Sequence, residues 1–312
     1  MVKILFVVHR YYPFPGGSEY YVRDMAEECV RRGFDVTVLA HEHQGDRNGV
    51  KVSSDYQILG QPWNLILIHG GDVISQNIAH INAFNIKSPA VYMIIKPSES
   101  APCMNGMKHH RFIAYSTSMD LEHIKKHRFL DKARRIRHGV VPDNTIVPVK
   151  TSIQPIYVSA GGFYPHKAMI PLAEAFEKSG VKGELHLYGY GEGELPKESD
   201  RVKVFYGKPK ADVMIAINNA KAYIMNSYEE GFGLVLLEAM MNHTPWFARN
   251  IAGAKDMAEY GYTYETEEQL MYYLETLDTL DAKVQSAYNY AMSNHTITQT
   301  VNDIEDILIE LK

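Results

Sequence analysis

Residues 221–248, KAYIMNSYEEGFGLVLLEAMMNHTPWFA, decide the fold. Residues 221–227 form a short apolar run that predicts a buried strand, and 245–248 predict another. Between them, Leu234–Met241 predicts a helix that begins directly after a turn with Gly231 and Gly233. A strand, a helix and a second strand in this order form a βαβ unit, which requires a parallel sheet and a right-handed crossover.

The same alternation continues on both sides of this unit. Strands are predicted at 2–8, 35–40, 65–69, 90–95, 111–115, 155–162, 184–189 and 201–207, and helices at 18–32, 167–179 and 210–219. Ser18 is expected to cap the first helix. Pro142 and Pro148 mark a connector between two such series. We therefore predict an α/β protein of two Rossmann-like domains facing across a cleft, at 1–148 and 149–294, with 295–312 as a terminal helix that packs back on the first domain.

Composition excludes several classes of protein. The chain has 312 residues, 46% of them hydrophobic and 22% charged, which argues against disorder and coiled coils. No run approaches the ~20 apolar residues of a membrane span, and the apolar start is strand-sized, unlike a signal peptide. Two cysteines cannot build a disulfide framework, and Cys103, His109 and His110 lack zinc-site spacing. We expect a cytoplasmic protein.

Charge is distributed unevenly along the chain. The net charge is −5, yet 108–138 contains nine Lys or Arg residues and only three acidic ones. These basic residues are Lys108, Arg111, Lys125, Lys126, Arg128, Lys132, Arg134, Arg135 and Arg137. Such a cluster indicates an anionic partner of the first domain, and solvated helix faces are the equally weighted alternative.

Ligands of open α/β sheets lie beyond the carboxyl ends of the strands, so the loops that follow strands are informative. Glycine-rich loops occur at 13–19, 161–167, 189–193 and 228–233. Glycine lets the backbone approach a phosphate, and the next helix offers free N–H groups. Glu230 precedes the last turn, and Glu238 lies about one turn into the next helix, where a carboxylate could accept hydrogen bonds from a ribose diol.

Taken in order, several segments resemble glycosyltransferase family 4, a group of retaining enzymes with the GT-B fold and sugar-nucleotide donors. They are HRYYPFPGGSE (9–19), RRGFDVTV (31–38), FIAYSTSM (112–119), RIRHGV (135–140), GGFYPHKAMIPLAEAF (161–176), HLYGYGEGE (186–194), VFYGKP (204–209) and EEGFGLVLLEAM (229–240). The resemblance covers nearly the whole chain.

The resemblance implies a role for each matching residue. Lys167 would contact the donor diphosphate, Glu230 the sugar hydroxyls, and Glu238 the ribose. The remaining donor-binding positions would be Gly16, Gly17, Gly162, Gly189 and the backbone amides of Phe232, Gly233 and Leu234. His69, at the end of a strand, is a further candidate catalytic residue, and an ordinary strand-end histidine is the alternative. The family needs no metal for its chemistry, and the chain has no Asp-x-Asp triplet.

Two departures from the family pattern stand out. Gly162 occupies the position of an arginine beside the phosphate lysine, and Lys96 replaces a histidine that approaches the transferred sugar. Lys96 could supply the missing positive charge.

The predicted function is metal-independent transfer of a hexose or pentose, with retention, from a nucleotide-diphosphate donor to an acceptor hydroxyl. No cofactor is expected. The acceptor is expected to be anionic, either a lipid-linked or membrane-surface glycan, with the protein peripheral at the inner membrane surface, or a modified base in DNA, as in phage DNA glycosylation. The first alternative is a catalytically weak protein that binds sugar nucleotides. A dehydrogenase is disfavoured because PFPGGSE replaces the G-x-G-x-x-G motif.

Overall fold

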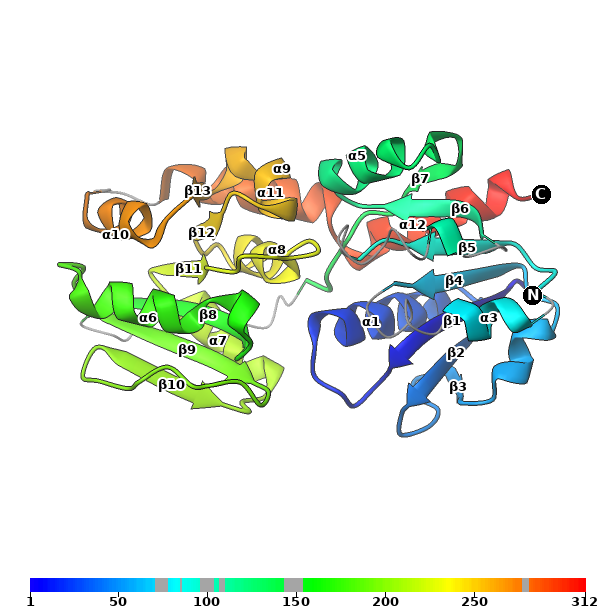
Figure 1. The fold of residues 1–312 in the computed structure, drawn as a ribbon, viewed down its shortest axis with the longest axis horizontal. Coiled ribbons are helices and arrows are strands. Elements are labelled where there is room, and N and C mark those ends of the chain that lie inside the picture. Colours follow the sequence, from blue (N-terminus) through cyan, green and yellow to red (C-terminus); the bar gives the residue numbers. More distant parts are fainter. Residues whose placement is uncertain (71–77, 85, 96–103, 107–109, 143–153, 277–280) are drawn as a thin grey trace. The chain divides into compact units, whose positions relative to one another are not determined.

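Two parallel sheets, each with helices on both faces, account for most of the chain (Figure 1). The computed structural model describes residues 1–70, 78–84, 86–95, 104–106, 110–142, 154–276 and 281–312. Internal contacts divide them into unit 1, Met1–Val141 with His295–Lys312, and unit 2, Pro142–Asn294. The predicted domain boundary at residue 148 lies outside the described residues. The predicted α/β class is confirmed.

The sheet of unit 1 has seven strands in the order β3-β2-β1-β4-β5-β6-β7, all parallel. The strands are β1 (Lys3–Arg10), β2 (Asp35–Glu42), β3 (Lys51–Ser53), β4 (Leu65–His69), β5 (Ala90–Met93), β6 (His110–Tyr115) and β7 (Ala133–Arg135). The chain runs outward from β1 to β3 and then returns to β4 on the other side of β1. The loops after β1 and β4 therefore flank a topological switch point.

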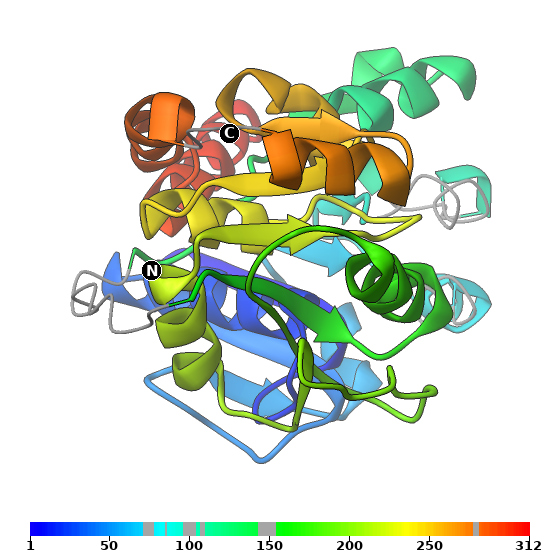
Figure 2. The same cartoon turned by 90° about the vertical axis from the view of Figure 1, so that its left-hand side faces the viewer.

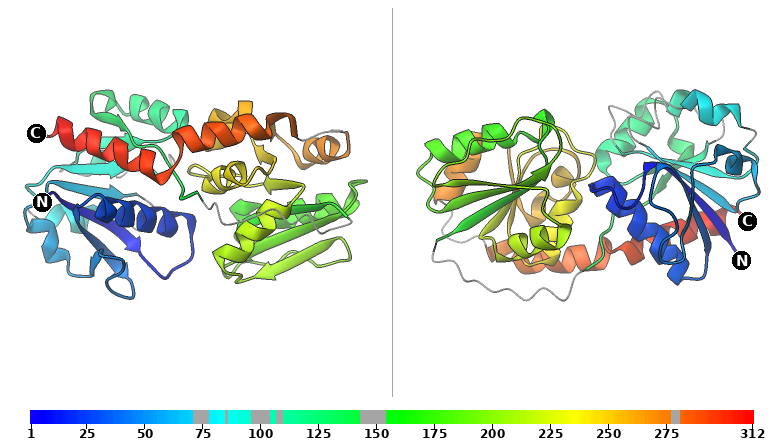
Figure 3. Two further views of the ribbon diagram at one scale, coloured as in Figure 1. Left: turned by 180° about the vertical axis from the view of Figure 1, so that it is seen from behind. Right: turned by 90° about the horizontal axis from the view of Figure 1, so that it is seen from below.

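Helices cover both faces of the unit 1 sheet. Side chains of α3 (Ile78–Ala83) and α5 (Ser118–Lys126) belong to a buried apolar cluster with strand residues such as Leu5 and Ile68. On the other face, α1 (Gly17–Arg31) and α12 (Ile297–Glu310) lie side by side (Figure 3). The burial of long apolar stripes on both helices is the main force that holds α12 there.

Polar contacts add to the attachment of α12. Asp303 accepts a hydrogen bond from the Arg137 backbone N–H at 2.8 Å and pairs with the Arg137 guanidinium. Arg32 donates to Glu305 at 2.8 Å, and Arg134 pairs with Glu310. Because Asp303 is buried, its loss would leave the partly buried Arg137 charge without its partner.

The sheet of unit 2 has six parallel strands in the order β10-β9-β8-β11-β12-β13. They are β8 (Ile156–Gly162), β9 (Glu184–Tyr190), β10 (Val202–Tyr206), β11 (Ala222–Met225), β12 (Trp246–Arg249) and β13 (Tyr262–Tyr264). The switch point of this sheet lies between β8 and β11.

The helices of unit 2 are α6 (Met169–Lys178), α7 (Lys210–Asn219), α8 (Leu234–Met241), α9 (Ala252–Asp256), α10 (Glu267–Thr276) and α11 (Val284–Asn294). Figure 2 shows α6 and α10 on one face of the sheet, where Leu172, Phe176 and Leu270 enter the core, with α7 and α8 on the other face. Within the described residues, no helix is both long and apolar enough to cross a membrane.

Two predicted helix starts are wrong. Ser18 does not cap α1, because Gly16 is the N-cap residue and no side chain bonds to the free N–H groups there. Lys167 does not begin α6 but ends a 3-10 turn, Pro165–Lys167, and Ala168 in the left-handed region (φ 49°) separates that turn from the helix. The lysine is consequently presented from a tight loop at the strand end.

Candidate functional site

The switch point of unit 2 brings together the loops that follow β8 and β11. Crevices at such points bind ligands because neighbouring loops leave the sheet in opposite directions there. Here the loop after β8 carries Lys167, and the loop after β11 carries Glu230. The two predicted residues are 63 positions apart in the chain but in direct contact in the structure.

Lys167 and Glu230 form the polar centre of this switch point. The Lys167 Nζ lies 2.5 Å from Glu230 Oε1, and the Ser227 hydroxyl donates to the same oxygen at 2.7 Å. The side chains of Lys167 and Glu230 are 22% and 14% exposed, so both charges are largely removed from water yet reachable by a ligand. A cation and a carboxylate held in this way can bind an anionic group and a hydroxyl group next to each other.

The backbone and a buried amide hold the two loops in place. Tyr228 N–H donates to the His166 carbonyl at 2.7 Å, and the Asn226 side chain donates to the Ala168 carbonyl at 2.9 Å. Asn226 also donates to Glu267, which pairs with Arg249. Burial alone would raise the pKa of Glu267, but the hydrogen bonds from Arg249 and Asn226 hold it below its usual value. No motif indicated Asn226, Ser227 or Arg249 as site residues, and the partners of Asn226 and Arg249 are distant in the chain.

The start of α8 offers backbone donors beside Glu230. Gly233 is the N-cap with φ 89°, and no side chain caps the helix. A Cβ at Gly233 would meet the Met225 Sδ at 3.0 Å, so both conformation and space favour glycine. The first N–H groups of a helix lack intrahelical acceptors and favour anions. The predicted positions Phe232, Gly233 and Leu234 therefore lie where an anion could bind.

Glu238 lies one turn into α8, as predicted, but it already has a partner. The Lys210 Nζ, at the first residue of α7, is 2.7 Å from Glu238 Oε1. Lys210 was not among the predicted site residues. Its signal in the sequence was its place directly after VFYGKP (204–209), one of the segments that carry the family resemblance.

The predicted glycines of unit 2 accommodate aromatic rings. A Cβ at Gly189 would lie 2.6 Å from Phe163 Cε2, and one at Gly162 would lie 2.3 Å from Tyr164 Cε2. Gly191, with φ 105°, is covered by the same Tyr164 ring. Packing against the rings of Phe163 and Tyr164 is therefore sufficient to require glycine in both loops, whether or not a ligand binds there.

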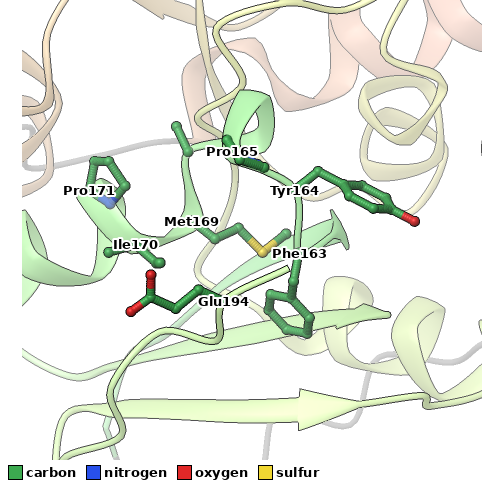
Figure 4. A pocket seen from close by; sticks show the side chains of 8 residues that line it. Phe163, Tyr164, Pro165, Met169, Ile170, Pro171 and Glu194 are labelled. Carbon is green, nitrogen blue, oxygen red and sulfur yellow. The ribbon is translucent and has the colours of Figure 1, made fainter. Parts of the chain in front are cut away.

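A pocket of about 320 Å³ adjoins these loops (Figure 4). Its walls come from the turn after β8, the first turn of α6 and the segment after β9. The lining residues are Phe163, Tyr164, Pro165, Ala168, Met169, Ile170, Pro171 and Glu194. The lining is mostly apolar, and Glu194 contributes its carboxylate.

Three predicted residues lie in unit 1, at the switch point between β1 and β4. Gly16 and Gly17 form the start of α1, and His69 ends β4. His69 is buried beside the ring of Tyr21, and within the described part of the chain its Nε2 has no hydrogen-bond partner. Burial lowers the pKa of His69 to about 4, so the ring is neutral at neutral pH.

The basic segment of unit 1 is partly neutralised. Arg134 and Arg137 pair with residues of α12, and Lys125 pairs with Glu122 at 2.7 Å. In the described residues, the exposed side chains of Lys126, Arg128 and Arg135 form no ion pair. The hydrogen bond from Arg134 lowers the pKa of Glu310, and the nearby charge of Arg111 lowers it further. Met119 at the start of α5, 40% exposed, and Leu130 in the turn after it, 52% exposed, lie in the same stretch of chain as Lys126 and Arg128. The stretch 118–132 therefore exposes both basic and apolar side chains.

Several predictions fall outside the described residues, namely those on Lys96, Cys103, Lys108 and His109. Among the residues that are described, no group of three or more His, Cys, Asp or Glu side chains is arranged to hold a metal ion.

Most of unit 2 matches the model of a known protein family. Residues 146–268 match the family model of glycosyl transferases group 1. No curated protein matches the sequence significantly.

Solved structures resemble the whole chain. Sucrose-phosphate synthase from Thermosynechococcus elongatus aligns over 100% of this chain and 99% of its own, with 14% identity and a TM-score of 0.77. Anabaena Alr3699/HepE in complex with UDP-glucose covers 99% and 100%, with 14% identity and a TM-score of 0.78. WaaG, a glycosyltransferase involved in lipopolysaccharide biosynthesis, covers 98% and 99%, with 16% identity and a TM-score of 0.70. The chain thus has the GT-B fold, and its second unit contains the sequence signature of the glycosyl transferases group 1.

Proposed function

We propose that the protein is a retaining, metal-independent glycosyltransferase of family 4 that takes a hexose or pentose from a nucleoside diphosphate donor bound to unit 2. The observation that carries this proposal is the contact of Lys167 with Glu230 beside the uncapped start of α8. The glycosyl transferases group 1 match covers this site, and one structural neighbour holds UDP-glucose.

In this proposal, each group has one task. Lys167 and the N–H groups at the start of α8 stabilise the charge that develops on the departing diphosphate. Glu230, held by Ser227, accepts hydrogen bonds from sugar hydroxyls. The acceptor oxygen forms its bond to the anomeric carbon on the face that the diphosphate leaves. The acceptor proton passes to the departing phosphate oxygen, which gives retention without an enzymic nucleophile.

The donor site is tested by titrating UDP, GDP and ADP into the protein in a calorimeter. Lys167→Ala removes one charge-assisted contact, and we expect affinity for the best ligand to fall by about 10- to 150-fold. Lys178→Ala is the matched control, because that lysine lies at the exposed end of α6. Unchanged affinity in a folded Lys167→Ala protein would contradict this donor site.

A protein that binds sugar nucleotides with little catalysis is the second candidate. The ring of Tyr164 over Gly162 favours it, because that position cannot hold a second phosphate-binding cation. Release of free sugar, or its transfer, from the best-bound nucleotide sugar separates the two candidates. Turnover that is abolished by Glu230→Ala supports the enzyme, whereas absence of turnover with every nucleotide sugar that binds supports the binding protein.

We further propose that the acceptor is anionic and lipid-linked, and that it docks on unit 1. Exposed Leu130 and Met119 occur in the same stretch of chain as exposed Lys126 and Arg128, which supports a membrane surface over DNA, because apolar side chains enter the headgroup region while basic ones attract anionic lipids.

Flotation with anionic and neutral vesicles, and binding to duplex DNA, test this proposal at low and moderate salt. We expect binding to anionic vesicles that weakens with salt and is reduced in the Lys125/Lys126/Arg128 triple alanine variant. A Lys178/Lys182/Lys197 triple alanine variant is the control, because it removes the same charge from unit 2. Salt-sensitive binding to DNA alone would favour a modified base as the acceptor. No binding to either, or equal binding by both variants, overturns the proposal.

A further inference from the structure

Tyr164 stands three residues before Lys167 in the turn that follows β8 and has no assigned task. Its ring covers two glycines at the carboxyl ends of neighbouring strands. A Cβ at Gly162 would lie 2.3 Å from the ring, and one at Gly191 would lie 2.8 Å from it. Neither position can take a side chain while the ring stays there.

The ring is held by its loop on several sides. Tyr164 N–H donates to the Gly162 carbonyl, and Lys167 N–H donates to the Tyr164 carbonyl, both at 2.9 Å. The ring is parallel to that of His166, at 5.9 Å between centroids. The Tyr206 hydroxyl donates to the Gly191 carbonyl at 3.1 Å and fixes the glycine beneath the ring. Tyr164 and Lys167 are therefore presented together by one ordered turn.

The outer end of Tyr164 is available to a ligand. The residue is 42% exposed, although Phe163 before it in the chain is buried. In Figure 4 its ring points away from Ile170 and Pro171, with the hydroxyl at the far end. Within the described residues that hydroxyl has no hydrogen-bond partner. A phenol hydroxyl held in this way can donate a hydrogen bond to a ligand.

The turn after β8 has little positive charge, so a further hydrogen-bond donor there would help to bind a diphosphate. Lys167 is the sole Lys or Arg between residues 161 and 168, and it is already paired with Glu230. A diphosphate has more acceptor oxygens than one ammonium group can satisfy. The position where a second cation could be added, Gly162, is closed by the ring itself.

We propose that Tyr164 is a donor-binding residue whose hydroxyl donates a hydrogen bond to the diphosphate and whose ring takes the space of a second cation. This inference rests on the proposed function of unit 2. It predicts that residues 162 and 164 can be exchanged as a pair, so that an arginine at 162 is tolerated only when the ring at 164 is absent.

The test is calorimetric titration of UDP, GDP and ADP into Tyr164→Phe, Gly162→Arg and the double variant Gly162→Arg/Tyr164→Ala, each checked for folding by thermal unfolding. Tyr164→Phe should bind the best nucleotide about 3- to 10-fold more weakly, since only the hydroxyl is lost. Tyr272→Phe, on exposed α10, is the matched control. Gly162→Arg alone should bind more weakly still, and the double variant should recover affinity and show a steeper salt dependence than the natural protein.

The outcomes separate this inference from the proposed function. If Lys167→Ala weakens binding but Tyr164→Phe does not, or if the double variant binds no better than Gly162→Arg, the inference on Tyr164 is overturned alone. If the natural protein binds none of the three nucleotides, or binds them equally well after Lys167→Ala, the donor site itself is wrong.

Discussion

Glu238 already forms an ion pair at the position where we expect the ribose to bind. Its carboxylate is paired with Lys210 at 2.7 Å, so a ribose diol would have to share it. We expect Glu238→Gln to abolish the preference for ribonucleotides over 2′-deoxynucleotides, because a neutral amide accepts weaker hydrogen bonds than a carboxylate. Lys210→Met is the control, since it removes the ion pair and leaves the carboxylate. Titrations with UDP and 2′-deoxy-UDP measure both, and an undiminished preference in Glu238→Gln removes Glu238 from the ribose site.

Some residues of the candidate site could be predicted from the sequence, and others could not. Glu230 and Glu238 stand in one short motif, and Lys167 follows a glycine-rich strand end, so local patterns were sufficient to select them. Lys210 contacts Glu238, and Tyr164 covers Gly191, only after segments that are distant in the chain have packed together. No spacing rule contains that information, because it depends on tertiary packing.

Among the elements, the junction between residues 136–140 and α12 depends on Gly139. A Cβ there would lie 2.4 Å from the Thr296 carbonyl oxygen, where Val140 and Ile297 exchange backbone hydrogen bonds with the opposite segment. We expect Gly139→Ala to destabilise unit 1 by about 1–3 kcal/mol, as overpacking does. Amide hydrogen exchange in 297–310 should accelerate. Gly60→Ala, with open space around the new methyl group, is the control, and equal exchange in both variants would contradict the expectation.

The apolar inner strands could be predicted, and so could the edge strand β10, whereas the other three edge strands could not. Strands such as β1, β4 and β11 are mostly buried and apolar, and the predicted ranges match them to within a few residues. Edge strands β3, β7 and β13 have three residues each, and β7 contains two arginines. Their strand conformation comes from pairing with a neighbour, which periodicity along the chain does not record.

For the molecule as a whole, three buried histidines make unit 1 sensitive to acid. Burial lowers the pKa of His69 to about 4 and of His138 to about 3, and it also lowers the pKa of His295. The unfolded chain takes up protons below its histidine pKa of about 6.5 while the folded rings stay neutral. Stability is therefore complete above that pH and falls below it, until the folded pKa values are reached, by about 1.4 kcal/mol per pH unit for each ring.

Urea unfolding between pH 7 and pH 5 checks this dependence. In a Trp246→Phe background the remaining tryptophan, Trp63, reports on unit 1 alone. His69→Asn should remove one ring's share of the pH dependence, and His186→Asn, in unit 2, should remove none. A pH dependence that is the same with and without His69 would show that this ring does not stay neutral in the folded state.

Unit 2 interrupts unit 1 in the chain, since residues 142–294 stand between the seven-stranded sheet and α12. On a ribosome, residues 1–141 emerge first, with the apolar face of α1 and its strands still uncovered. Unit 2 is complete before α12 appears. At roughly 5–20 residues per second, synthesis of residues 142–294 takes about 8–30 seconds. The inserted unit therefore sets a minimum delay during which the nascent first unit must avoid aggregation without its last helix.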